Sequence, residues 1–372
     1  MRRRLVTVFV LVLGVGVCLF ARGRDEVGEG VVGPGGVSAF GAVFHFAPVD
    51  QGRTSVCWSF STVSFLETEM VRLGLPKVKM AVMYPVYYGW VEKARYFVQT
   101  KGESRFSPGD LFPTVLDAIQ KYGIVPEESY SGRPSGEEDY NHNAMYRELR
   151  EYRDRVKKDG LWDEAEVVTQ VKSILDKHLG KPPERFEYEG RSYTPTSFRE
   201  KFMALPWQDY LLVTSFEYAP FHTFTDLRVP DNWRKNERYY NVPLDAFYEG
   251  LKGALRAGYS VAIDGDISEP GRVAARDVAF IPDDDIPPAL ISQEAREQRF
   301  REKLTKDDHL MHIVGMTQSG GHDWFLVKDS WHDAWDGKHK GYFFYRGDFA
   351  KLKILAYLVH KDAVPASWSK RP

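Results

Sequence analysis

The sequence predicts an α+β fold, with helices in its first half and an antiparallel sheet in its C-terminal third. From Cys57 to Gly74, apolar side chains recur three or four positions apart, which is the spacing of one helix face. After residue 308 the pattern changes to short apolar runs separated by polar turns, which is typical of strands. Hydrophobic residues make up 43% of the 372 residues, so the chain can bury a sizeable core.

The individual elements follow from the same two spacings. Helices are expected at 57–74, at 111–122, once or twice within 141–180, at 196–204, at 243–258 and at 292–303. Strands are expected at 210–218, 259–263, 310–316, 324–328, 341–345 and 356–360. The charged and proline-containing stretch from 269 to 308 is expected to be a long surface excursion around its helix.

The N-terminal segment has the pattern of a secretory signal peptide, which we place at residues 1–22. Three arginines precede the uncharged, almost wholly apolar run Leu5–Phe20, and charged residues follow it. The run is shorter than the roughly 20 residues that span a bilayer, so an uncleaved N-terminal anchor is the alternative. A flexible linker is expected at 23–43 and one domain at 44–372. The protein is therefore expected in the periplasm or outside the cell, without an integral membrane domain after cleavage.

Charge and cysteine content narrow the class of function. The chain has 50 Lys and Arg against 52 Asp and Glu, so its net charge of −2 gives no electrostatic case for binding nucleic acid. No metal or organic cofactor is expected. Only Cys57 would remain after removal of a signal peptide that contains Cys18. A lone thiol in an oxidising compartment is either a reactive, functional group or a buried inert one.

The residues around Cys57 favour the reactive alternative. Cys57 begins a predicted helix, whose positive N-terminal end favours the thiolate form of the sulfur. Gln51 lies six residues earlier across a loop. Its amide N–H, together with the backbone N–H of Cys57, would make a two-donor oxyanion hole. The alternative for Gln51 is a loop residue that bonds within its own turn.

Two further segments offer partners for this thiol. His309 begins an apolar strand and is the candidate base, whereas His312, on the opposite face, is expected to be a packed core histidine. Asp329 follows another strand and can accept the second imidazole N–H of His309, which would fix its tautomer. Trp331 would shield that bond from water. The alternative for the segment with Asp329 and Trp331 is a polar turn with a core tryptophan.

These motifs together resemble those of papain-like cysteine peptidases: Gln51, Cys57-Trp58-Ser59-Phe60, His309 before an apolar strand, and Lys328-Asp329-Ser330-Trp331. The segments 121–127, 230–233, 257–261 and 360–365 are similar, more specifically, to the bleomycin hydrolase and aminopeptidase C branch. The resemblance covers roughly residues 44–366. It implies a papain-like fold with a cleft between a helical half and a sheet half. It also implies hydrolysis of a peptide or protein substrate by a Cys-His-Asp triad.

The chain also departs from that family. Cys57 and His309 are 252 positions apart, against about 130–150 in typical papains, which implies insertions. Asp329 replaces the usual asparagine, and Ser55 and His332 replace usual glycines. Only seven residues follow Pro365, where the branch has a longer arm that enforces aminopeptidase action. Aminopeptidase and endopeptidase action therefore both stay open, as do transfer to an amine and a catalytically inactive, peptide-binding protein.

Substrate contacts are expected at two further places. Gly109 and Asp110 match the family's glycine-containing strand beside the cleft, with a plain turn before a helix as the alternative. Asp264 and Asp266 follow a strand that resembles one lining the side-chain pocket. An acidic pocket that prefers basic residues is one interpretation of this pair, and solvated turn acids are the other, favoured one. Trp331 is the remaining candidate.

Overall fold

The computed structural model describes residues 31–134 and 138–369, so the expected signal peptide lies outside the described residues. The helices are α1 (Cys57–Arg72), α2 (Met83–Gln99), α3 (Phe112–Tyr122), α4 (Asn143–Asp159), α5 (Glu164–Leu179), α6 (Pro195–Phe202), α7 (Leu244–Arg256), α8 (Gln293–Arg301) and α9 (Gly347–Lys353). The strands are β1 (Phe186–Tyr188), β2 (Arg191–Tyr193), β3 (Tyr210–Thr214), β4 (Phe224–Thr225), β5 (Tyr239–Asn241), β6 (Val261–Gly265), β7 (Arg272–Val273), β8 (Val278–Ala279), β9 (His309–Ser319), β10 (His322–Lys328), β11 (Tyr342–Arg346) and β12 (Ile354–His360).

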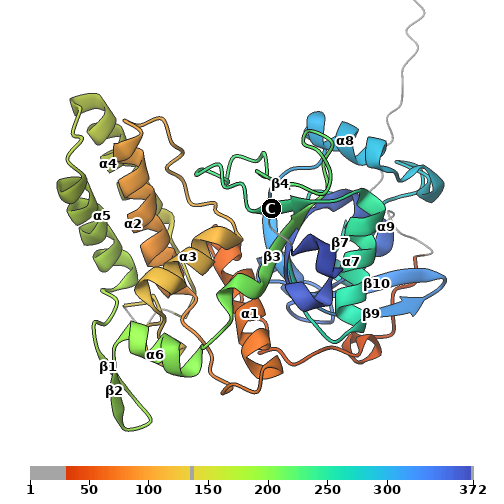
Figure 1. Cartoon of the computed structure of the whole chain (residues 1–372), viewed down its shortest axis with the longest axis horizontal. Coiled ribbons are helices and arrows are strands. Elements are labelled where there is room, and N and C mark those ends of the chain that lie inside the picture. The colour runs from red at the N-terminus through yellow and green to blue at the C-terminus, as the bar shows by residue number, and fades with distance from the viewer. Residues whose placement is uncertain (1–30, 135–137, 370–372) are drawn as a thin grey trace, which may run out of the picture.

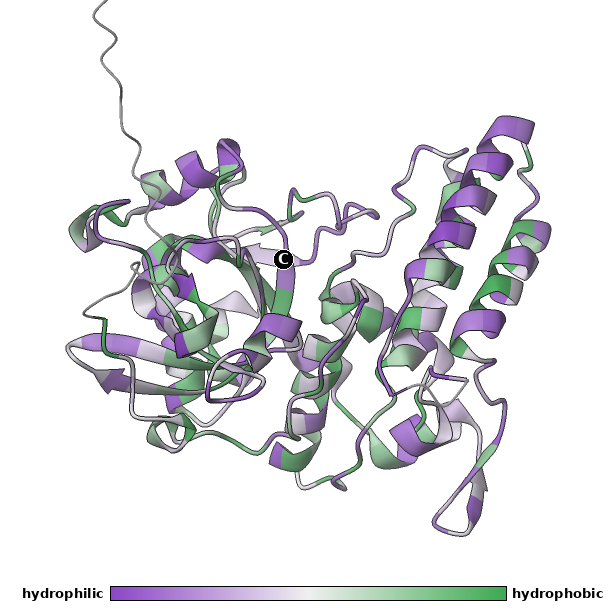
Figure 2. Cartoon of the chain, turned by 180° about the vertical axis from the view of Figure 1, so that it is seen from behind, coloured by the Kyte–Doolittle hydropathy of each residue, from purple (hydrophilic) through white to green (hydrophobic). Residues whose placement is uncertain are grey.

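The elements form two halves with α1 between them (Figure 1). Helices α2, α4 and α5 pack together on one side, and the large sheet with α7 and α9 makes up the other side. Helix α1 packs against β9 and β6 of the sheet and against α2 and α3 of the helical half. In Figure 2 the outer turns of α4 are mostly hydrophilic, as expected for a helix with one face in water. The predicted α+β class is confirmed.

The sheet topology brings distant segments to one edge. The strand order is β4-β5-β3-β12-β6-β9-β10-β11-β8-β7, and neighbours are antiparallel except for the pairs β3–β5 and β8–β11. Because β10 runs antiparallel to β9, the end of β10 lies beside the start of β9. His309 at the start of β9 and Asp329 just after β10 therefore meet at the same edge. Gly265 of β6 pairs with His309 on the other side.

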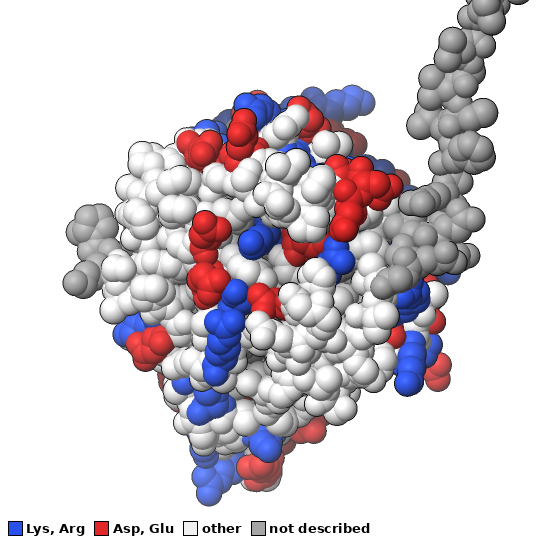
Figure 3. All heavy atoms as spheres, turned by 90° about the vertical axis from the view of Figure 1, so that its right-hand side faces the viewer, with Lys and Arg blue, Asp and Glu red and all other residues white. Residues whose placement is uncertain are grey.

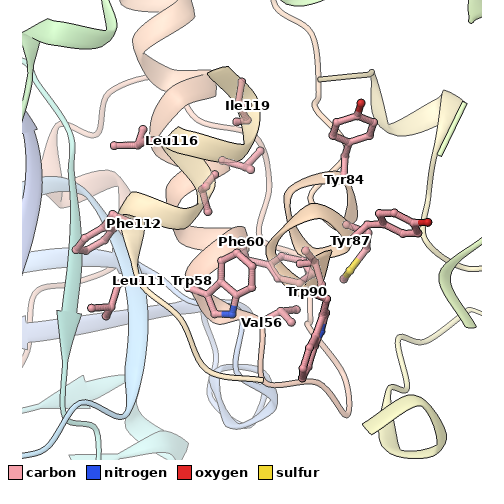
Figure 4. Packing of buried hydrophobic residues seen from close by; sticks show 14 of the residues in the cluster. Val56, Trp58, Phe60, Tyr84, Tyr87, Trp90, Leu111, Phe112, Leu116 and Ile119 are labelled. Carbon is pink, nitrogen blue, oxygen red and sulfur yellow. The ribbon is translucent and has the colours of Figure 1, made fainter. Parts of the chain in front are cut away.

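The helical half is held by a large apolar core on α1, α2 and α3 (Figure 4). The side chains of Trp58 and Phe65 on α1, Val86 on α2 and Phe112 on α3 are each 3% exposed or less. The indole N–H of Trp58 donates to the carbonyl of Pro108 at 3.2 Å, so this buried polar group is satisfied. The residue after Cys57 is thus fixed in the core, and this in turn fixes the start of α1.

The fold differs from the sequence expectations at α2 and at the expected linker. Helix α2 was not predicted, because residues buried around most of its surface mask the periodicity of a half-exposed helix. The expected linker 23–43 is wrong in its last part. Residues 37–40 form a 3₁₀ helix, Phe40 is 2% exposed with its ring 4.9 Å from that of Phe344, and the N–H of Val43 donates to Val314. Apolar side chains in this segment pack on the sheet before Phe44.

The surface shows no segregation of charge on the face drawn in Figure 3, where acidic and basic side chains are interspersed. None of the helices in the described part of the chain is long and apolar enough to cross a membrane.

Candidate active site

A cleft of about 1060 Å³ lies between the two halves. Most of the predicted site residues line it: Gln51, Cys57, Gly109, Asp110, His309 and Trp331. Asp329 lies directly behind His309, and Asp266 does not line the cleft. The topology therefore brings together residues that are more than 250 positions apart in the sequence.

Cys57 is the first residue of α1, and its side chain is nearly buried. The loop before it requires glycine at position 52, where φ is +59° and a Cβ would lie 2.3 Å from the carbonyl oxygen of Tyr140. Ser55 and His332, which stand where the resemblance expects glycine, both have negative φ values. Neither substitution therefore strains the backbone.

Gln51 is held in place by hydrogen bonds to Ser330 and to its own loop. Its backbone N–H donates to the carbonyl of Ser330 at 2.8 Å, and its Oε1 accepts from the Ser330 hydroxyl at 2.8 Å. Its Nε2 donates to the carbonyl of Thr54 at 3.0 Å. One amide N–H is therefore used within the loop, as the alternative interpretation held. The second N–H has no acceptor among the described residues, and Gln51 lines the same cleft as Cys57.

His309 and Asp329 form a buried pair. Nε2 of His309 lies 2.7 Å from Oδ1 of Asp329, and both residues are 2% exposed. Burial alone would lower the pKa of His309, but the charge of Asp329, followed by the Cys57 thiol, raises it to about 10. Because Nε2 is committed to Asp329, Nδ1 is the nitrogen left for Cys57.

Arg272 completes this group, and sequence reasoning missed it. Its Nη2 donates to Oδ2 of Asp329 at 2.9 Å, it also pairs with Asp333, and its guanidinium lies 3.8 Å from the ring centre of Phe343. Burial alone would raise the pKa of Asp329, but His309 and then Arg272 lower it to about 2. Arg272 falls within the stretch expected to be solvated surface, so no local signal marked it.

Trp331 and His312 both lie where the sequence predicted. The backbone N–H of Trp331 donates to Oδ1 of Asp329 at 2.8 Å, and its ring centre lies 6.0 Å from that of His309. His312 is 1% exposed on the opposite face of β9, with its Nδ1 2.9 Å from the Ser64 hydroxyl. Burial lowers the pKa of His312 well below its usual value, as expected for a neutral core histidine.

Gly109 and Asp110 form part of the cleft wall. A Cβ at Gly109 would overlap the carboxylate of Asp231, so any other residue here would require this acid to move. Asp110 has less freedom to contact a substrate. Its Oδ1 accepts from the N–H of Leu111 at 2.9 Å, and its Oδ2 lies 2.9 Å from the ammonium of Lys93. We therefore infer that Asp110 stabilises the segment at the start of α3.

The pair Asp264 and Asp266 is buried, so the favoured interpretation as solvated turn acids is wrong. Asp266 is 1% exposed, and its carboxylate accepts from Ser268 and from the backbone N–H of Lys306. It stabilises the loop after β6 and does not reach the cleft. Asp264 is fully buried, and no N–H or O–H group of the described residues donates to either of its oxygens.

This fold, with a cysteine at a helix start facing a carboxylate-bound histidine across a cleft, defines the class of papain-like cysteine peptidases. The chain belongs to the Peptidase C1-like family, whose model matches residues 43–371.

Individual relatives agree with this assignment. The chain is 22% identical to aminopeptidase C of Listeria monocytogenes, over 84% of this chain and 79% of the relative. It is 20% identical to aminopeptidase C of Streptococcus thermophilus, over 86% of this chain and 84% of the relative. The fold matches the crystal structure of PepW from Lactobacillus rhamnosis with a TM-score of 0.68, at 18% identity, over 88% and 83% of the two chains. The protein is a papain-like cysteine peptidase similar to aminopeptidase C.

Proposed function

We propose that this peptidase is exported and hydrolyses peptide bonds with Cys57 as nucleophile, His309 as acid and base, and Asp329 as the orienting group. The contact of 2.7 Å between His309 and Asp329 carries the proposal. It commits one ring nitrogen to the carboxylate and leaves the other for the thiol. The resulting charged pair is the form in which a cysteine nucleophile is active.

Each step then has a group in place. The Cys57 thiolate attacks the carbonyl carbon, and the oxyanion accepts from the free N–H of Gln51 and from the backbone N–H of Cys57. His309 donates its proton to the leaving amine, which leaves a thioester on Cys57. Water attacks the thioester while His309 takes up a proton, and the acid product leaves with the thiolate restored.

Two finer features belong to the same proposal. The names of the two relatives support action at the N-terminus of peptides, so we propose an aminopeptidase rather than an endopeptidase. The charged and apolar pattern of residues 1–22 supports export.

The test compares hydrolysis of a peptide library by the wild type and by three variants. Cys57→Ala and His309→Ala should lose about 10⁴-fold or more in kcat/KM. Gln51→Ala should lose about 10²–10³-fold in kcat. Cleavage by the Cys57→Ala protein would refute the mechanism. A wild type whose Cys57 fails to react with iodoacetamide near neutral pH, yet binds peptides, would favour the inactive, peptide-binding alternative. Products joined to an added amine would indicate transfer.

A further inference from the structure

One wall of the cleft holds more buried acid than the neighbouring bases neutralise. Asp231 and Asp307 line the cleft together with Cys57. Asp264 of β6 lies behind them, and the charges of Asp307, Cys57 and Asp231 all act on its carboxyl. The groups that face this cluster from the surrounding elements are Lys93 of α2, Arg105, Asp110, Tyr239 of β5 and Cys57 of α1.

Both bases pair with acids other than Asp264 and Asp307. Lys93 pairs with Asp110 at 2.9 Å and donates to the carbonyl of Gly109 at 2.7 Å. Arg105 is partly exposed and lies 3.3 Å from Asp231. No basic side chain of the described residues pairs with Asp264 or Asp307. These two carboxyl groups are therefore left without a positive partner.

Three of the four carboxyl oxygens of these two acids lack a hydrogen-bond donor in the part of the chain that the structure describes. Both oxygens of Asp264 and Oδ2 of Asp307 are buried without an N–H or O–H donor from the described residues. Burial, followed by the charge of Asp307, raises the pKa of Asp264 well above its usual value. Burial, followed by the charge of Asp231, raises the pKa of Asp307 to about 8. A buried acid pair in this state is costly unless a cation or a proton joins it.

We propose that Asp307, supported by Asp264, binds a primary ammonium group of the peptide substrate, either its free N-terminal amine or a lysine side chain. This assignment rests on the proposed peptidase function, since it places the ammonium beside the bond that Cys57 attacks. A compact ammonium group has three donors for two carboxyl groups that face each other, whereas a planar guanidinium is matched by the two oxygens of one carboxylate. Among the described residues, no group of three His, Cys, Asp or Glu side chains is arranged to hold a metal ion.

The first arm of the test measures hydrolysis. Wild-type kcat/KM is compared for tetra-alanine amide and its N-acetyl form, and for acetyl-Ala-Lys-Ala-Ala amide and its norleucine counterpart. We expect the ammonium-bearing member of one pair to be favoured about 100-fold or more, and that pair identifies the source. The ratio should fall at least tenfold in Asp307→Asn and in Asp264→Asn. Asp336→Asn is the matched control, because Asp336 is an exposed acid of the same cleft outside the cluster, and its ratio should stay that of the wild type.

The second arm separates this subsite from the proposed chemistry. Calorimetry on the Cys57→Ala protein measures binding of the same four peptides at pH 7, in buffers of different ionisation enthalpy. Binding that requires the ammonium, releases about one proton and is lost in Cys57→Ala/Asp307→Asn supports the subsite even if the wild type hydrolyses nothing. Equal binding, or equal hydrolysis, of both members of both pairs overturns it, as does the absence of any peptide binding. Thermal unfolding checks that each variant is folded, and Asp264→Asn replaces Asp307→Asn if the latter is not.

Discussion

The guanidinium of Arg272 lies 2.9 Å from the carboxylate of Asp329, and both side chains are almost fully buried. Asp329 therefore bridges Arg272 and His309 with its two oxygens. An aspartate brings a negative charge to a position where the resemblance expects a neutral asparagine. Arg272 balances that charge in the low-dielectric interior, so the aspartate is accommodated there as one member of an ionic group.

The first prediction concerns the pH dependence of catalysis. The charge of Asp329 holds the pKa of His309 at about 10, so the imidazolium persists to unusually high pH. Asp329→Asn removes that charge, and the pKa of His309 should fall by about one to three units. The alkaline limb of kcat/KM should therefore move to lower pH by the same amount, with activity retained. An active variant whose alkaline limb does not move would show that Asp329 does not act on His309.

The second prediction concerns Arg272 as a positioning residue. Arg272→Met leaves the buried carboxylate of Asp329 without its cation, and it should lower the free energy of unfolding by about 3–5 kcal/mol. The double variant Arg272→Met/Asp329→Asn removes both charges and should recover most of that loss. Its alkaline limb should match that of Asp329→Asn alone. Chemical denaturation and pH–rate profiles of the three variants test this, and a double variant no more stable than Arg272→Met would contradict it.

The third prediction separates the two histidines of β9. His312→Ala should lower the free energy of unfolding by about 1–3 kcal/mol, since it removes one of the two partners of the buried Ser64 hydroxyl, the other being the Lys328 ammonium. Because burial depresses the pKa of His312, its contribution is complete above about pH 6.5 and decreases as the pH falls below that value. Denaturation at pH 5 and pH 8 measures this difference. The rate at which iodoacetamide labels Cys57 should stay that of the wild type, whereas a large fall would place His312 in the active site.

The fourth prediction follows from the acid cluster. The pKa of Asp307 is raised to about 8 in the folded protein, so folding takes up a proton between roughly pH 4 and pH 8. The free energy of unfolding should therefore decrease as the pH rises through that window. Asp307→Asn removes this contribution, so its stability relative to the wild type should improve steadily from pH 4 to pH 8. Parallel urea titrations give the comparison, and an unchanged pH slope would refute it.

The fifth prediction concerns export. The mature protein should begin between about residue 20 and residue 30 and should be recovered outside the cytoplasm. N-terminal sequencing of the protein purified from its source tests both points. Full-length protein that begins at Met1 in a soluble cytoplasmic fraction would contradict the proposal, and full-length protein in the membrane fraction would indicate an uncleaved anchor.

The sequence by itself determined the elements and motifs that depend on local chemistry. The helix that begins at Cys57, the strand that begins at His309 and the strand that precedes Asp329 each have local apolar periodicity. The side-chain types at these positions already define what chemistry they can perform. The resemblance of the motifs predicted the papain-like arrangement. In the structure, the antiparallel pairing of β9 and β10 brings His309 and Asp329 together as that arrangement requires. The burial of His312 also followed from the alternation of side chains along one strand.

Only the tertiary structure decided which charged side chains are buried around the catalytic residues. Arg272 and Asp264 lie in segments that are polar or flanked by charge, and such a pattern is the same whether a side chain faces water or a buried partner. Their burial depends on pairing between strands and loops far apart in the chain, which no local spacing encodes. Helix α2 escaped prediction for a related reason, because burial on most of its surface removes the contrast on which periodicity depends. The partners of the buried charges, and with them the proposed ammonium subsite, exist only once the strands and loops of the sheet half pack together.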